Sequence, residues 1–210
     1  MNSWIIIGIG ALAQLLFSSR LVLQWVLSEK HRKVLTPLLF WELSLLASFL
    51  LFIYGYLRTD FAIMLGQSLT YYIYIRNIQL QGQWKKIHKA LRLFIYLFPL
   101  IVVVYGYNNN QYDLHNLIGD HTIALPLLIL GIISQLLFTF RFIYQWLYSE
   151  KRKESHLPLG FWAISLAGSS LILTYAVLRL DPVLFAGHFI GFIVYIRNII
   201  IIRKNGTATR

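Results

Sequence analysis

The stretch that decides the fold is residues 14–30, QLLFSSRLVLQWVLSEK, because nearly the same sequence returns at residues 135–151 as QLLFTFRFIYQWLYSEK. The offset of 121 residues continues without a gap to the pair Arg76-Asn77, which returns as Arg197-Asn198. Self-similarity at a fixed offset is the signature of a repeat architecture. The chain therefore contains one ancestral unit twice, and both copies are expected to fold alike.

The composition is that of a membrane protein. Hydrophobic residues make up 58% of the 210 positions and charged residues only 13%, which exceeds what the core of a soluble domain requires. About 17 to 25 apolar residues in a helix cross the roughly 30 Å of a bilayer core. Seven apolar segments are long enough: 4–27, 38–57, 61–78, 91–107, 122–148, 159–178 and 182–202. We expect an all-α membrane protein with seven transmembrane helices, the first of which is retained rather than cleaved.

The net charge of +11 follows membrane topology and does not indicate nucleic acid. Lysines and arginines gather after the first, third, fifth and seventh segments, and basic loops face the cytoplasm. The sequence predicts a multi-pass protein of the bacterial inner membrane with its N-terminus outside and its C-terminus in the cytoplasm.

The order of the segments predicts two parallel repeats. Because an odd number of crossings separates the copies, both have the same orientation and are related by an axis along the membrane normal. We expect a first triple-helix bundle at 1–79 and a second at 122–204. Residues 80–121 would form a basic linker, a linking helix and an outer loop, and residues 205–210 a tail.

Both copies resemble a known family. The run Q-L-L-F-x-x-R-x-x-x-Q-W-x-x-S-E-K is followed by P-L-x-F-W-x-x-S-L, Y-x-x-x-R-x-D and Y-I-R-N. These motifs, at residues 11–79 and 132–200, resemble the domain named for the N-terminus of lipid-A-disaccharide synthase. That family is similar at a distance to SWEET and PQ-loop transporters, which implies a 3+1+3 plan of helices. The Pro-Gln pair of PQ-loop proteins is absent from this sequence.

The resemblance implies a role in lipid A biosynthesis and, by its name, a synthase activity. A sugar-nucleotide glycosyltransferase requires an α/β domain with a nucleotide crevice, and no glycine-rich strand-turn-helix motif or metal-binding carboxylate pair occurs. Whether the chain is an enzyme stays open. We expect no catalytic residue, no metal and no other cofactor, and the lack of cysteine excludes thiol chemistry.

Two arginines inside apolar segments are the most informative residues. Arg20 and Arg141 lie about eight residues, or roughly 12 Å, inside the cytoplasmic ends of their segments. Such burial is costly, so these side chains face a partner, a wet cavity or a ligand. Gln24 and Gln145 follow on the same helical faces. One interpretation is a snorkelling arginine that packs the bundle; the other is an anion site, because guanidinium binds phosphate or carboxylate through two parallel hydrogen bonds.

Further candidates lie on the other helices of each copy. Gln67 and Tyr74 in the first copy, and His188 and Tyr195 in the second, could line a central path or simply pack the helices. Trp41 and Trp162 are candidate substrate contacts, and Trp41 is also expected in an aromatic belt at the interface. Arg76, Asn77, Arg197 and Asn198 could form a gate or phosphate clamp, or reach to lipid headgroups.

The carboxylates break the symmetry of the copies. Glu42 lies inside a segment and is expected to form a structural ion pair with Arg20. Its counterpart is Ala163, so Arg141 is expected to face Ala163 and to have no built-in carboxylate. The second copy is therefore the expected ligand site. Glu29, beside Lys30, is interpreted as part of a solvated charge cluster.

Our leading interpretation is a SWEET-like transporter or flippase that moves or presents an anionic lipid-linked sugar, either a polyprenyl-phosphate sugar or a lipid A precursor. The alternative is a non-transporting membrane subunit that recruits a glycosyltransferase through the basic loops at 30–33 and 81–89. The family activity, lipid-A-disaccharide synthase, comes third. The expected partners are a membrane lipid and a possible glycosyltransferase, without nucleic acid and with the oligomeric state open.

Overall fold

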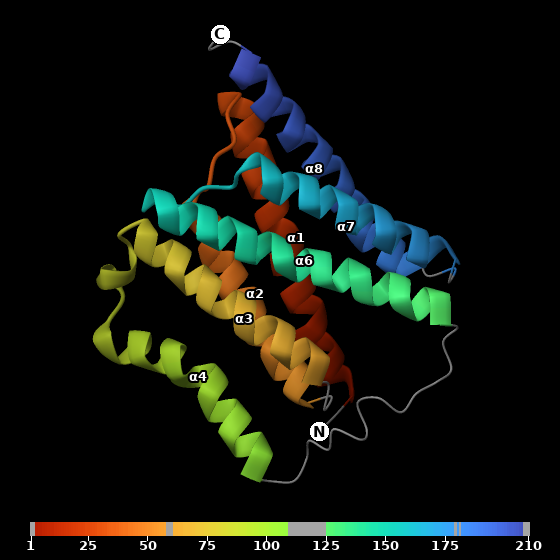
Figure 1. Ribbon diagram of the computed structural model, residues 1–210. Helices are drawn as coiled ribbons and strands as arrows, with labels where there is room; N and C mark the ends of the chain where they lie inside the picture. Colours follow the sequence, from red (N-terminus) through yellow and green to blue (C-terminus); the bar gives the residue numbers. More distant parts are fainter. Residues whose placement is uncertain (1–2, 58–60, 109–124, 179, 181, 208–210) are drawn as a thin grey trace. The chain divides into compact units, whose positions relative to one another are not determined.

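The computed structural model describes residues 3–57, 61–108, 125–178, 180 and 182–207 (Figure 1). Within these ranges the regular structure is helical, which confirms the all-α prediction. The seven α-helices and one short 3-10 helix of the described residues are α1 (Ser3–His31), α2 (Leu38–Leu57), α3 (Phe61–Leu80), η1 (Trp84–Lys86), α4 (Lys89–Asn108), α6 (Leu125–Arg152), α7 (Leu159–Leu178) and α8 (Pro182–Thr207).

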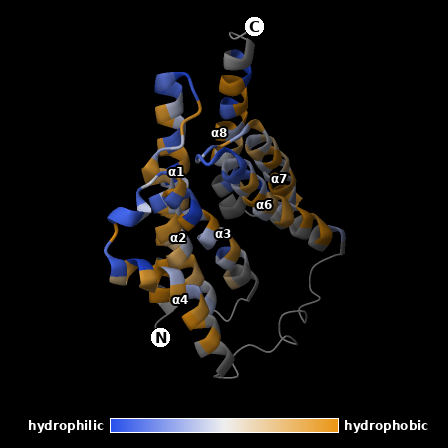
Figure 2. Ribbon diagram, turned by 60° about the vertical axis from the view of Figure 1, so that its left-hand side comes forward, coloured by the Kyte–Doolittle hydropathy of each residue, from blue (hydrophilic) through white to orange (hydrophobic). Residues whose placement is uncertain are grey.

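Three helices of the described residues are long and apolar enough to cross a membrane: Trp4–His31, Leu38–Leu57 and Leu159–Leu178. Figure 2 shows hydrophobic residues along the helices and hydrophilic ones mainly near helix ends. Large apolar side chains such as Leu15, Leu93 and Leu136 are exposed on helix surfaces, as expected for contact with lipid. Membrane association is therefore supported, whereas seven spans, the SWEET-like arrangement and the orientation stay predictions.

The chain forms two compact units. Unit 1 comprises residues 1–17 and 41–121, and unit 2 comprises residues 18–40 and 122–210. The C-terminal half of α1 thus belongs to the same unit as α6, α7 and α8, although its sequence comes from the first repeat. The predicted domains follow the repeat in sequence, and their boundaries stay predictions.

In unit 1 a proline in α4 determines how this helix attaches to α3. Pro99 lies inside α4 and has no N–H, so it cannot donate to the carbonyl of Ile95 four residues earlier. The hydroxyl of Tyr71 on α3 donates to that carbonyl at 3.0 Å. The ring of Phe98 on α4 packs against that of Phe49 on α2, with 4.2 Å between the two ring centroids. Aromatic contacts therefore hold α4 on this unit, together with the Tyr71 bond and a second one from the hydroxyl of Tyr72 to the carbonyl of Tyr96.

The turns after α1 and α6 have the same structure in both repeats. Arg32 and Lys153 occupy equivalent positions with φ of 51° and 58°, the left-handed conformation that ends many helices. The next amide, of Lys33 or Glu154, donates back to the carbonyl of Ser28 or Ser149. This pattern is a Schellman motif, and it turns the chain toward the next helix at the same point in each copy.

The packing of the second helix of each repeat on the third is repeated as well. Trp41 on α2 lies 6.2 Å from Tyr74 on α3, and Trp162 on α7 lies 6.1 Å from Tyr195 on α8, between ring centroids. Each α2–α3 and α7–α8 pair also has a serine hydroxyl that donates to a backbone carbonyl. These bonds are Ser48 to Gln67 at 3.5 Å and Ser169 to His188 at 3.2 Å. The duplicated sequence therefore encodes duplicated local structure.

Candidate anion-binding site

Arg141 on α6 is buried in unit 2 among neutral groups. Its side chain is 8% exposed, and Nη1 donates to the hydroxyl of Tyr195 at 3.0 Å and that of Ser165 at 3.3 Å. Nε is buried without a hydrogen-bond partner. Among the described residues no carboxylate pairs with it. A buried cation with two neutral partners still has the capacity to bind an anion.

Aromatic rings surround this guanidinium. Its central carbon lies 4.5 Å from the ring centroid of Phe138, 4.8 Å from that of Phe142 and 5.6 Å from those of Phe161 and Tyr195. Ring faces attract cations, by about 0.5 to 2 kcal/mol per favourable contact. The rings therefore offset part of the cost of burial without neutralising the charge.

Arg20 on α1 also lies in unit 2 and shares one of these rings. It is 4% exposed, and its guanidinium carbon lies 5.1 Å from the centroid of Phe40 and 5.4 Å from that of Phe142. Because the corresponding carbon of Arg141 is 4.8 Å from the same Phe142 centroid, the two carbons are at most about 10 Å apart. The structure thus brings together two of the predicted site residues from different repeats.

The expectation that Arg141 faces Ala163 is wrong. Ala163 is exposed, and α7 presents Ser165 to the arginine instead. Two residues along a helix correspond to about 200° of rotation, so Ala163 points away from the site. Glu42, at the equivalent position of α2, is also exposed. The expected structural ion pair between Glu42 and Arg20 stays a prediction.

The amide side chains join helices to one another and to loops. Gln24 on α1 donates from Nε2 to Asn198 Oδ1 on α8 at 2.9 Å, and Asn198 Nδ2 donates back at 3.2 Å. Gln145 donates to Ser149 Oγ and to the carbonyl of His156, both at 2.9 Å. All of these amides are fully buried. Their polar atoms are therefore used within the protein, which gives them a structural role beside any contact with a ligand.

The remaining candidates are placed as follows. The ring centroid of His188 lies 5.1 Å from that of Phe138, which is one of the rings that surround the Arg141 guanidinium. Gln67 has a buried Oε1 without a hydrogen-bond partner. Asn77 is buried and donates to the carbonyl of Ile73, and Arg76 donates to Gln79. Trp41 and Trp162 are fully buried in protein, so the prediction of an aromatic belt at Trp41 is wrong.

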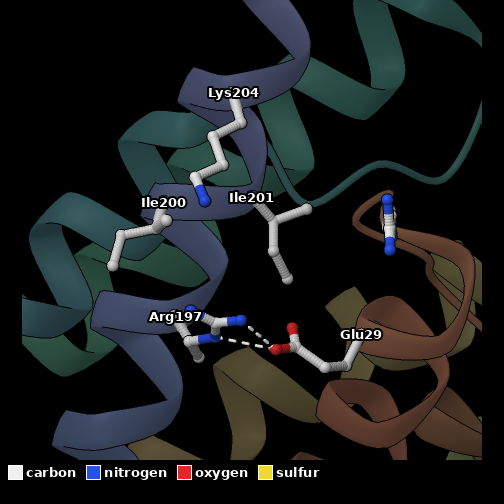
Figure 3. A pocket seen from close by; sticks show the side chains of 6 residues that line it. Glu29, Arg197, Ile200, Ile201 and Lys204 are labelled. Carbon is white, nitrogen blue, oxygen red and sulfur yellow. Dashed lines mark hydrogen bonds and ion pairs between the residues drawn. The ribbon is translucent and has the colours of Figure 1, made fainter.

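A cavity of about 650 Å³ lies at the C-terminal end of α8 within unit 2. Arg197 projects from α8 toward Glu29 of α1, and its Nε and Nη2 both donate to Glu29 Oε1, the Nε bond being 2.8 Å (Figure 3). Glu29 is therefore not merely a solvated charge, as the sequence suggested. Lys204 follows two turns along α8 and also lines the cavity.

Several functional candidates escaped the sequence analysis. Ser165, Phe138 and Phe142 contact Arg141, but nothing in an apolar helix marks which residues face inward. Gly191 is a further case, because a Cβ there would lie 3.1 Å from the hydroxyl of Tyr195. Thr70 occupies the equivalent position of the first repeat, so a comparison of the copies could have signalled it. No cluster of acidic and histidine side chains fit for a metal occurs in the described ranges.

Comparison with known proteins identifies the family. The relatives found include lipid-A-disaccharide synthases from Chlamydia felis (strain Fe/C-56), 29% identical over 93% of this chain and 33% of the relative, and Chlamydia pneumoniae, 27% identical over 98% of this chain and 35% of the relative. The chain thus spans about a third of the length of these relatives. No solved structure matches. The model of the Lipid A Biosynthesis N-terminal domain matches residues 9–79 and 130–200, and the chain belongs to this family.

Proposed function

We propose that this chain is a membrane protein of lipid A biosynthesis that binds the phosphate of a lipid-linked sugar and moves or presents that lipid. The lipid would be a polyprenyl-phosphate sugar or a lipid A precursor. The observation that carries the proposal is Arg141, a guanidinium that is 8% exposed and bonded to two neutral hydroxyls. The family membership and the names of the relatives support the process.

The energetics favour a ligand over a purely structural role for Arg141. A central arginine in a membrane helix costs about 2.5 to 3.5 kcal/mol even on the mildest scale. A neutral residue of similar volume could pack against Phe138, Phe142 and Phe161 without this cost. An arginine that remains charged among these rings offers directed donors, and phosphate accepts them in parallel pairs.

The synthase activity belongs to relatives about three times as long as this chain, so it enters here only as an alternative. A second candidate is a subunit that recruits a soluble glycosyltransferase. The observation in its favour is the exposed basic group at the end of α6, which comprises Lys151, Arg152 and Lys153. Such a group suits an acidic partner surface.

The decisive experiment reconstitutes the purified protein in vesicles with a fluorescent polyprenyl-phosphate sugar. Binding and transfer of the probe between leaflets are measured separately. We expect Arg141→Gln to reduce binding at least tenfold while the protein still folds. Arg20→Gln is the matched control, expected to act chiefly on thermal stability. Equal losses of binding at equal stability would show a symmetric site, and unchanged binding in both would refute the proposal. A recruiting subunit would transfer no lipid by itself.

A further inference from the structure

The cavity at the C-terminal end of α8 shares no lining residue with the surroundings of Arg141, and it is lined mainly by charged side chains instead of aromatic rings. Three basic side chains and one carboxylate line it, together with two isoleucines: Arg32, Arg197, Lys204, Glu29, Ile200 and Ile201. Its volume of about 650 Å³ falls in the range of pockets that hold small molecules, roughly 300 to 1,000 Å³. A formal excess of two positive charges among these side chains favours an anion.

Glu29 already shows how an anion binds there. One carboxylate oxygen accepts both Nε and Nη2 of Arg197, the side-on arrangement that guanidinium also makes with phosphate. The two side chains are 38% and 43% exposed, so a competing anion can reach them. In Figure 3 Lys204 lies along α8 from this pair, on the same cavity.

The arginine is held in place by the residue that follows it. Asn198 is fully buried and makes two hydrogen bonds with Gln24, one turn before Glu29 on α1. This amide pair fixes the backbone of α8 beside α1. Arg197 can therefore exchange one anion for another without movement of the helices.

We propose that this cavity binds a phosphate monoester, which takes the place of Glu29 on Arg197 while Lys204 and Arg32 contribute further positive charge. A monoester carries a charge of about −1.5 to −2 near neutral pH, which matches the excess of the cavity. Ile200 and Ile201 provide an apolar wall for the group esterified to the phosphate. The site is distinct from Arg141, so it does not depend on the proposed function.

The most telling variant is Glu29→Gln. It removes the resident anion, so binding of phosphatidic acid from mixed nanodiscs is expected to strengthen about tenfold, the equivalent of one charge-assisted hydrogen bond. A purely structural ion pair predicts the opposite, a loss of stability without a gain in binding. Glu154→Gln is the matched control, because it changes the net charge equally at a side chain that is 74% exposed and does not line the cavity.

Lys204→Gln keeps the test valid if Glu29→Gln fails to fold, since Lys204 is exposed. It is expected to weaken phosphatidic acid binding about tenfold. Arg32→Asn should act likewise, whereas Lys153→Asn, at the equivalent left-handed position of the other repeat, should not.

Competition against labelled phosphatidic acid separates the possible sources of the phosphate. If unlabelled phosphatidic acid displaces the label and neither inorganic phosphate nor phosphatidylcholine does, the site selects a lipid headgroup. If inorganic phosphate displaces the label as well, the site recognises the phosphate alone and also takes a free anion. Both results support the site. Equal gains from Glu29→Gln and Glu154→Gln, or binding insensitive to Lys204→Gln and Arg32→Asn, would overturn it.

Discussion

At the scale of single residues, the asymmetry between the repeats resides in the surroundings of Arg141. Tyr195 accepts a hydrogen bond from this arginine, and Gly191, one turn earlier on α8, leaves the room that the phenol occupies. The first repeat has Thr70 where the second has Gly191. A small residue on α8 thus helps to position the polar partner of a buried charge.

We expect Gly191→Ala to weaken binding of the lipid probe about threefold to tenfold. The added Cβ would lie 3.1 Å from the hydroxyl and 3.2 Å from Cζ of Tyr195, so the ring must move by a few tenths of an ångström, which disturbs its hydrogen bond with Arg141. Tyr195→Phe should weaken binding similarly, and the double variant should lose no more than either single one, because both act through one hydroxyl.

Gly168→Ala is the control for added volume in the same unit. Its Cβ would lie 3.3 Å from that of Leu137, and the equivalent position in the first repeat already holds Ala47. Additive effects of Gly191→Ala and Tyr195→Phe on binding would contradict a common mechanism.

At the scale of elements, the carbonyl of Ile95 in α4 has no backbone donor, because Pro99 lacks an N–H, and accepts its hydrogen bond from the hydroxyl of Tyr71 on α3 instead. Tyr71→Phe is expected to lower the free energy of unfolding in detergent by about 1 kcal/mol, because the Ile95 carbonyl then lacks both donors. In a Pro99→Ala background the amide at position 99 can donate again, so Tyr71→Phe should have a smaller effect. A double-mutant cycle of thermal stabilities measures this coupling.

Tyr72→Phe is the matched control for this cycle. Its hydroxyl donates to the carbonyl of Tyr96 at 3.0 Å, but Leu100, four residues on, retains its own amide donor. We therefore expect little coupling between Tyr72 and Pro99. The same coupling for both tyrosines would mean that Pro99 acts on α4 as a whole and not through Ile95.

The end of α6 offers a stabilising change. Lys153 has φ of 58°, where a side chain is strained and glycine is not. Its ion pair with Glu150 is exposed on the lysine side and contributes little. Lys153→Gly should therefore raise the stability by about 0.5 to 1 kcal/mol, as measured by thermal unfolding. Lys151→Gly, inside the helix, should lower it by a similar amount.

At the scale of the whole molecule, the orientation in the membrane is the main open prediction. The chain has no cysteine, so single cysteines report without background. Lys86 lies in η1 and is exposed, whereas Asn109 lies outside the described residues. An impermeant thiol reagent on intact spheroplasts should label Asn109→Cys and spare Lys86→Cys. The reverse pattern would invert the topology deduced from the basic loops.

Much of the architecture could be predicted because the repeat and the apolar segments are local properties of the chain. The helices α2, α3, α7 and α8 begin within one residue of the expected positions, and Arg20 and Arg141 are buried as their depth implied. The inward faces could not be predicted, since apolar residues surround most of each helix and period alone does not single out one side. For this reason Ser165 was missed and Ala163 was wrongly expected to face Arg141.

The sequence by itself determined the duplication, the helical class, the family and the presence of charges within apolar helices, because these follow from the order of residues along the chain. Only the tertiary structure decided which side chains meet. It joined Glu29 of the first repeat to Arg197 of the second, and Gln24 to Asn198, across separations of more than 160 residues. It also showed two arginines over the ring of Phe142. Such contacts depend on how each helix is rotated about its axis, and packing between helices, rather than local sequence, sets that rotation.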